Sequence, residues 1–152
     1  MRPFKFNLEA VLRWKKGQEE AALKEFGEAM RRKAKAIEEL QLARRYLGNL
    51  LNSLREERAK GKQSVWNQTM YMQAISRQEG ICKHKEEILE KVTIEEGVYR
   101  EKYLQKKREA EAIEKVKDKR RFLYEKEANI RLEKELEEIV LSKMVRSDYG
   151  AT

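Results

Sequence analysis

The side chains that most often carry chemistry are few and isolated in this sequence. Cys82 and His84 are its only cysteine and its only histidine. A structural zinc site takes about four ligands, most of them cysteine or histidine, and a disulfide needs two cysteines. We therefore predict no metal site and no internal disulfide. Cys82 is expected to pack within a hinge segment, and His84 to face solvent.

Acidic residues are plentiful, but they lack the surroundings that catalysis requires. A pair such as Glu137–Glu138 acts as general acid and base only in a concave, partly dry site that shifts its pKa values. The seven glycines stand singly and form no phosphate-binding loop. We therefore predict that the protein is not an enzyme and that it takes no cofactor and no small-molecule ligand.

Basic residues form two dense clusters, RRKAK at 31–35 and KVKDKRR at 115–121, in a chain whose net charge is +8. Such clusters can bind nucleic-acid phosphates. Acidic residues flank the second cluster on both sides, however, and mixed charge at this spacing is typical of a solvated helix face with ion pairs between residues four apart. We predict no nucleic-acid binding. A gel shift with steep salt dependence would support the alternative, a basic nucleic-acid-binding coiled coil.

The residues that position these side chains are predicted to be helical almost throughout. Pro3 is the only proline, and charged residues make up 41% of the chain. From residue 23 onward, apolar residues recur in alternating steps of three and four, the heptad pattern of a coiled coil. This first seam places polar residues at two positions, Lys33 and Arg44. A second helical pattern with a sparser apolar seam follows from about residue 85.

The predicted fold is all-α, with two long helices in an antiparallel coiled-coil hairpin and a short helical hinge segment. We place the first arm at about 7–60, the hinge at about 61–84, the second arm at about 85–146 and a frayed tail at 147–152, all in one coiled-coil domain. The two arms are expected to be similar in length, with both termini at the end opposite the hinge. The predicted core comprises Leu23, Phe26, Met30, Ile37, Leu40, Leu47, Leu51, Leu54, Ile113, Leu123 and Ile130.

The opening RPFKFNLEAVLRWKKGQEEAA combines aromatic and basic residues with a helix start. Asn7 is a suitable N-cap, with Leu8 as the first helical residue. Phe6 and Val11 have the spacing of a hydrophobic staple. Capping explains neither Phe4 nor the tryptophan at position 14.

This opening resembles the N-terminus of the flagellar export stalk proteins, the FliJ family, in which an aromatic-x-aromatic-x-Leu-Glu-x-x-Leu motif precedes basic residues and Glu-Glu-x-Ala. The matching positions are Phe4, Phe6, Leu8, Glu9, Leu12, Arg13, Glu19, Glu20 and Ala22. The end of the chain, KEANIRLEKELEEIVLSK, is similar to the C-terminal pattern of the family, with Glu137–Glu138 in place of the usual Asp-Glu.

The resemblance implies a coiled coil similar to the two-helix shaft of the rotary ATPase γ subunit. Its implied partners are the hexameric flagellar export ATPase, whose central pore it would enter, the membrane export gate protein and the substrate-specific export chaperones. It further implies a cytoplasmic protein, peripheral at the inner-membrane base of the flagellum. We expect the free chain to be a monomer. A coiled-coil scaffold, which would be dimeric, and a stalk protein of the related injectisome remain alternatives.

Two groups of contact residues are predicted on this basis. Cationic and aromatic residues near both termini are expected to contact the ATPase ring: Arg2, Phe4, Lys5, Arg13, Trp14, Lys16, Lys143 and Arg146. Apolar and aromatic residues of the hinge segment are expected to contact the export gate: Trp66, Met70, Tyr71 and Ile75.

Overall fold

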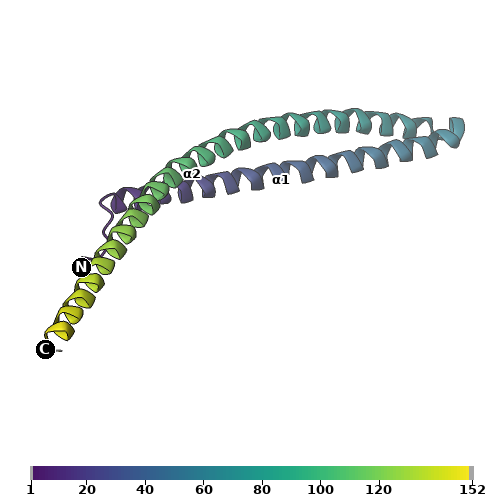
Figure 1. The fold of residues 1–152 in the computed structure, drawn as a ribbon. Coiled ribbons are helices and arrows are strands. Elements are labelled where there is room, and N and C mark those ends of the chain that lie inside the picture. The colour runs from purple at the N-terminus through teal and green to yellow at the C-terminus, as the bar shows by residue number, and fades with distance from the viewer. Residues whose placement is uncertain (1, 151–152) are drawn as a thin grey trace. The chain divides into compact units, whose positions relative to one another are not determined.

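A computed structural model describes residues 2–150 of the chain. Helix α1 spans Glu9–Ala59 (51 residues), the 3-10 helix η1 spans Gly61–Ser64, and helix α2 spans Val65–Gly150 (86 residues). No strand occurs among the described residues, which confirms the all-α hairpin (Figure 1). Contacts divide the chain into two compact units. One contains residues 18–106, and the other contains the residues up to 17 and from 107 onward.

The helix boundaries differ from the prediction at the hinge and at the tail. The hinge consists of η1 and its flanking residues, because α2 already begins at Val65 and continues through Gly80 without a break. The two helices are therefore unequal in length, whereas we predicted arms of similar length. Helix α2 also continues over 147–150, where we predicted a frayed tail. The remaining predicted tail residues, 151–152, lie outside the described part of the chain. A single glycine costs a helix only about 1 kcal/mol, which the surrounding helix formers offset.

The turn at η1 is closed by side chains that cap the end of α1. Gly61 has a φ of 76°, the left-handed conformation that glycine adopts without steric cost after a helix. The hydroxyl of Ser64 donates to the carbonyl oxygen of Glu57 at 2.6 Å, and Gln68 Nε2 donates to the carbonyl of Gly61 at 3.1 Å. The Glu57 carboxylate accepts a hydrogen bond from Lys60 Nζ at 3.0 Å, and this bond lowers the pKa of Glu57.

In the unit of residues 18–106, α1 lies antiparallel to α2 (Figure 1). Mostly small residues of α1 form the seam between them. One half of the seam recurs every seven residues and is buried: Ala22, Ala29, Ala36, Ala43 and Leu50. The other half comprises Phe26, Lys33, Leu40, Leu47 and Leu54, all of them buried or half-buried. The second half agrees with the predicted register, and the first half is shifted by one residue.

The shift corrects four predicted core residues, whose side chains are 37–46% exposed: Leu23, Met30, Ile37 and Leu51. The physical reason is the close approach of the two helices, which brings Gln78 of α2 within hydrogen-bond distance of the main chain at Ala43. Small residues therefore occupy the buried positions, and the larger apolar residues lie at the edge of the seam. In the other half of the seam, Tyr103 stacks on Phe26 with ring centroids 6.1 Å apart.

Several polar groups of α1 in this unit have partners on α2. Lys33 Nζ lies 3.1 Å from a carboxylate oxygen of Glu96, so the predicted polar position at 33 is confirmed. The predicted polar position at 44 is exposed, and its guanidinium pairs with Glu86 outside the seam. The buried Gln78 donates to the carbonyl oxygen of Ala43 at 3.0 Å, a contact with the main chain that the small alanine permits.

In the other unit, α2 uses a different face from the one predicted. Ala110 is buried and Ile113, Lys117 and Tyr124 are half-buried, in steps of three, four and seven. Of the predicted core residues in this region, only Ile113 lies on this face. Leu123 and Ile130 are 48% and 43% exposed, so their assignment to the hairpin core was wrong. Apolar spacing alone could not choose between two faces of one helix.

We predict that enlarging a seam alanine destabilises the hairpin. Ala29 is only 1% exposed, so the variant Ala29→Leu forces the helices apart at a cost of about 1–3 kcal/mol of unfolding free energy. The matched control Ala34→Leu, at an exposed position of α1, should change it by less than about 0.5 kcal/mol. Urea unfolding followed by circular dichroism measures both, and equal effects of the two variants would refute the alanine seam.

Candidate partner-binding sites

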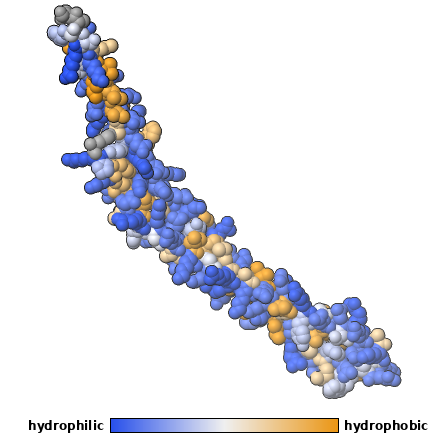
Figure 2. Space-filling model, turned by 90° about the horizontal axis from the view of Figure 1, so that it is seen from below, coloured by the Kyte–Doolittle hydropathy of each residue, from blue (hydrophilic) through white to orange (hydrophobic). Residues whose placement is uncertain are grey.

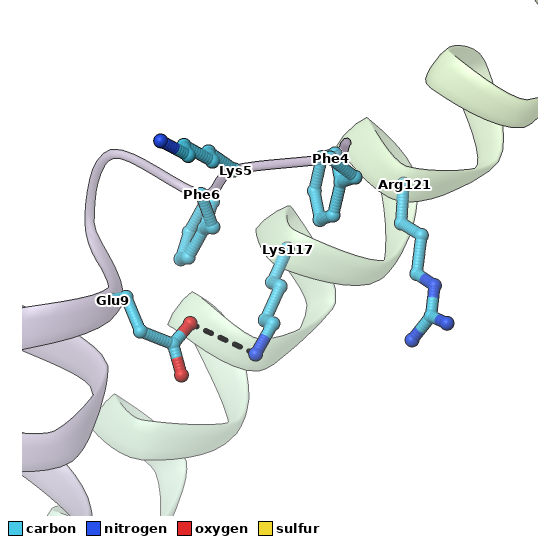
Figure 3. A pocket seen from close by; sticks show the side chains of 6 residues that line it. All are labelled: Phe4, Lys5, Phe6, Glu9, Lys117 and Arg121. Carbon is cyan, nitrogen blue, oxygen red and sulfur yellow. Dashed lines mark ion pairs between the residues drawn. The ribbon is translucent and has the colours of Figure 1, made fainter. Parts of the chain in front are cut away.

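The N-terminal segment lies as an extended chain against α2 (Figure 3). The rings of Phe4 and Phe6 point to the same side and Lys5 points to the other, the alternation of an extended backbone. The aromatic-x-aromatic spacing therefore places both rings toward one surface. That surface is the part of α2 that carries Lys117 and Arg121.

Two residues of α2, Arg120 and Tyr124, hold this segment. The ring centroids of Phe4 and Tyr124 are 5.5 Å apart, and the Tyr124 hydroxyl donates to the carbonyl oxygen of Arg2. Phe6 is buried, and the Arg120 guanidinium lies 5.6 Å from its ring centroid, in cation–π range. We call residues 2–7 together with these two residues the N-terminal clasp.

The side chain of Asn7 takes part in the clasp instead of capping α1 as predicted. Asn7 Oδ1 accepts a hydrogen bond from the Arg120 guanidinium, and α1 begins at Glu9 rather than at Leu8. The carbonyl oxygen of Leu8 accepts a hydrogen bond from the amide of Leu12 at 2.9 Å, so Leu8 occupies the N-cap position. The predicted staple is not formed either, because Val11 is exposed while Phe6 is buried.

Ion pairs continue the contact between the two segments. Lys117 Nζ lies 2.8 Å from a carboxylate oxygen of Glu9, and this hydrogen bond lowers the pKa of Glu9 (Figure 3). Farther along, Lys15 pairs with Glu109 at 3.0 Å. Within the basic cluster at 115–121, only Arg121 forms the predicted pair with a residue four positions away, Glu125. Lys117 and Arg120 instead contact Glu9 and Asn7, so part of KVKDKRR faces the N-terminal part of the chain and not solvent.

The residues predicted to contact an ATPase ring are exposed, with one exception. Trp14 is 60% exposed, with the ammonium of Lys15 5.1 Å from its ring centroid. The exposed cations of this group are Arg2, Lys5, Arg13, Lys16, Lys143 and Arg146. Phe4 is the exception, because its ring is half-buried and packs on Tyr124. Part of its surface is thereby used in a contact within the chain, and its contact with a partner stays a prediction.

The residues predicted to contact an export gate fall into two groups. Trp66 is 73% exposed and Met70 is exposed, and both line a groove with the half-buried Tyr71. Ile75 is only 7% exposed and packs in a core cluster with Leu50 and Leu54. Ile75 therefore supports the hinge from within, and its prediction as a surface contact was wrong.

The reactive side chains singled out by type do not form a site. Among residues 2–150, no three His, Cys, Asp or Glu side chains are placed to bind a metal ion. Cys82 is buried, and His84 is exposed. Over the same residues, no helix is long and apolar enough to cross a membrane.

Comparison with known proteins identifies the family. The sequence model of the flagellar FliJ protein matches residues 4–148, nearly the whole chain. The chain belongs to the FliJ family. The match covers the clasp residues from Phe4 onward, the turn and both long helices, so FliJ membership supports a role related to flagellar export. No curated protein and no solved structure matches the chain.

Sequence reasoning missed Arg120 and Tyr124, the α2 half of the clasp. In the sequence, Arg120 is one of several cations in the basic cluster at 115–121, and Tyr124 belongs to no motif. The available signal was that Phe4 and Phe6 lie two residues apart, a spacing that suits an extended segment better than a helix. Such a segment needs a surface with an aromatic ring and a hydrogen-bond donor.

We predict that removing the Tyr124 ring releases the N-terminal segment. The variant Tyr124→Ala loses both the ring contact with Phe4 and the hydrogen bond to Arg2, so trypsin should cut after Lys5 several-fold faster than in the unmodified protein. The control Phe122→Ala removes an exposed ring two residues away and should leave the cleavage rate unchanged. Equal rates in all three proteins would show that the clasp does not restrain the segment.

We also predict a pH-dependent contribution from Glu9. Because the Lys117 ammonium lowers the pKa of Glu9 below its ordinary value of 4.5, the folded chain binds fewer protons at this site than the unfolded chain. The stabilisation is therefore present above the ordinary pKa and is lost as the pH falls through the folded-state value.

Thermal unfolding of Glu9→Gln should show this dependence. Its midpoint should lie below that of the unmodified protein at neutral pH, and the difference should vanish at acidic pH below the lowered pKa of Glu9. The control Glu20→Gln, at an exposed position of α1, should have little effect at neutral pH. A difference that stays constant with pH would contradict the assignment.

Proposed function

We propose that this protein is the stalk of the flagellar export ATPase, which links the hexameric ATPase to the membrane export gate and escorts export chaperones. The observation that carries the proposal is the family match over residues 4–148 on a two-helix hairpin. The absence of a metal cluster and of a catalytic constellation among the described residues is compatible with a role in binding rather than in catalysis.

The proposed ring contact uses the exposed cations near the termini. Lys143 and Arg146 line a shallow groove on α2 together with Ile139. Exposed cations beside apolar surface suit acidic loops of a protein pore, because the charges steer the encounter and the apolar side chains add contact area. Trp14 adds a large exposed ring in the first part of α1.

The proposed gate contact uses the groove near the turn. Trp66 and Met70 are exposed large side chains, and tryptophan is enriched among the residues that dominate binding energy. Tyr71 and the buried Ile75 hold the base of this surface against α1. The protein would thus work at the cytoplasmic side of the flagellar base.

Stimulation of ATP hydrolysis tests the proposal. The chain should stimulate a purified hexameric export ATPase, and the double variant Lys143→Glu/Arg146→Glu should reduce the stimulation several-fold, because repulsion replaces attraction. The matched control Trp66→Ala/Met70→Ala should keep full stimulation and instead weaken binding to the cytoplasmic part of the export gate.

The outcomes separate the two parts of the proposal. No stimulation by the unmodified chain would overturn the stalk function. Unchanged stimulation after reversal of Lys143 and Arg146, and again after loss of Arg2 and Lys5, would overturn the assignment of the terminal residues to the ring.

A further inference from the structure

Helix α2 carries a second apolar heptad seam that the hairpin does not use. Val116, Leu123, Ile130 and Met144 recur at seven-residue steps, with Glu137 at the step between the last two. Their apolar side chains are 41–60% exposed. We call the line formed by residues 116, 123, 130, 137 and 144, together with the interleaved positions 112, 119, 126, 133 and 140, the outer seam.

The outer seam is distinct from the face that packs on the N-terminal segment. That inner face contains Ala110, which is 1% exposed, and the half-buried Lys117 and Tyr124. Figure 2 shows hydrophobic surface among polar side chains over the C-terminal part of α2. A heptad sustained over this length is the pattern by which one helix pairs with another.

Charge along the outer seam is polarised, with Lys119 and Lys126 in its first half and Glu133 and Glu137 in its second half. The whole stretch of α2 follows the same trend. Residues 112–126 contain six basic and three acidic side chains, a net charge of +3. Residues 127–141 contain two basic and five acidic side chains, a net charge of −3. A helix that complements this stretch must carry the same two halves in reverse order, and an antiparallel copy of the same helix does so.

We propose that two copies of the chain associate through their outer seams in antiparallel orientation. In such a pair of identical helices, the numbers of facing residues add to a constant. The register that sets Lys119 opposite Glu137 of the second copy also sets Val116 opposite Val140 and Ala112 opposite Met144. At the centre, it sets Leu123 opposite Glu133 and Lys126 opposite Ile130, where the charged ends can extend to solvent past the apolar contacts. Each of these pairs occurs twice by symmetry.

This inference goes beyond the proposed function and revises the expectation of a monomeric free chain. That expectation followed from the pairing of the two helices within one chain, whereas the outer seam lies outside this pairing and is exposed. The test needs neither the ATPase nor the gate. The dimer can therefore be refuted while the stalk function stands, and the stalk function can be refuted while the dimer stands.

Sedimentation equilibrium of the full chain over a wide range of protein concentrations tests the proposal. The unmodified protein should show a reversible monomer–dimer equilibrium. Lys119→Glu and Glu137→Lys should each weaken the dimer about tenfold or more, because both symmetry-related pairs become repulsive. The double variant Lys119→Glu/Glu137→Lys should restore the dimer, since the two charges exchange places.

Two controls keep the outcomes decisive. Lys35→Glu makes the same charge change at an exposed position of α1 and should leave the equilibrium unchanged. Circular dichroism should show full helix content in every variant. A monomer at all concentrations overturns the proposal. So does a dimer that the single reversals do not weaken or that the double variant does not restore, because a parallel pair would not place Lys119 near Glu137.

Discussion

The close approach of α2 to the alanine face of α1 is the contact on which the unit of residues 18–106 depends. Ala22, Ala29, Ala36 and Ala43 are buried at seven-residue steps. The small side chain at position 43 allows Gln78 of α2 to reach the main-chain carbonyl of Ala43. An alanine seam buries less apolar area per layer than a leucine seam, so paired charges and rings take a larger share in fixing which residues face each other.

The N-terminal segment is held by a different kind of contact. It contributes aromatic rings at alternate positions of an extended chain, and α2 supplies a ring, a hydroxyl and a guanidinium to meet them. The same positions belong to the motif that the sequence shares with the FliJ family. In this chain, the aromatic part of the motif therefore anchors the segment, while Arg13 of the motif and the neighbouring Trp14 are exposed.

The architecture was predictable because its signals are repetitive and local: one proline at the start, helix formers throughout and a glycine at the turn. The register of the seam, that is, which residues of α1 face α2, was not predictable from the sequence. Leu23 and Ile37 outweigh their alanine neighbours on any hydrophobicity scale, yet the buried positions are set by the fit against α2, whose facing residues are distant in sequence, as Tyr103 is from Phe26. The partner of Phe4 was unpredictable for the same reason, since nothing local to Tyr124 marks it. Among the candidate contacts, exposure agreed with the prediction for the charged residues and failed for Ile75, whose apolar side chain suits a core equally well.

The position of Cys82 has a practical consequence. Its thiol is the only one in the chain, and it is buried where α2 pairs with α1. A reagent can reach it only when the helices separate locally, because the thiolate must be exposed to react. The rate of alkylation thus reports how often this part of the hairpin opens, and it does so in the unmodified chain. The single cysteine, for which we predict no chemical role, therefore serves as a probe of local opening of the coiled coil.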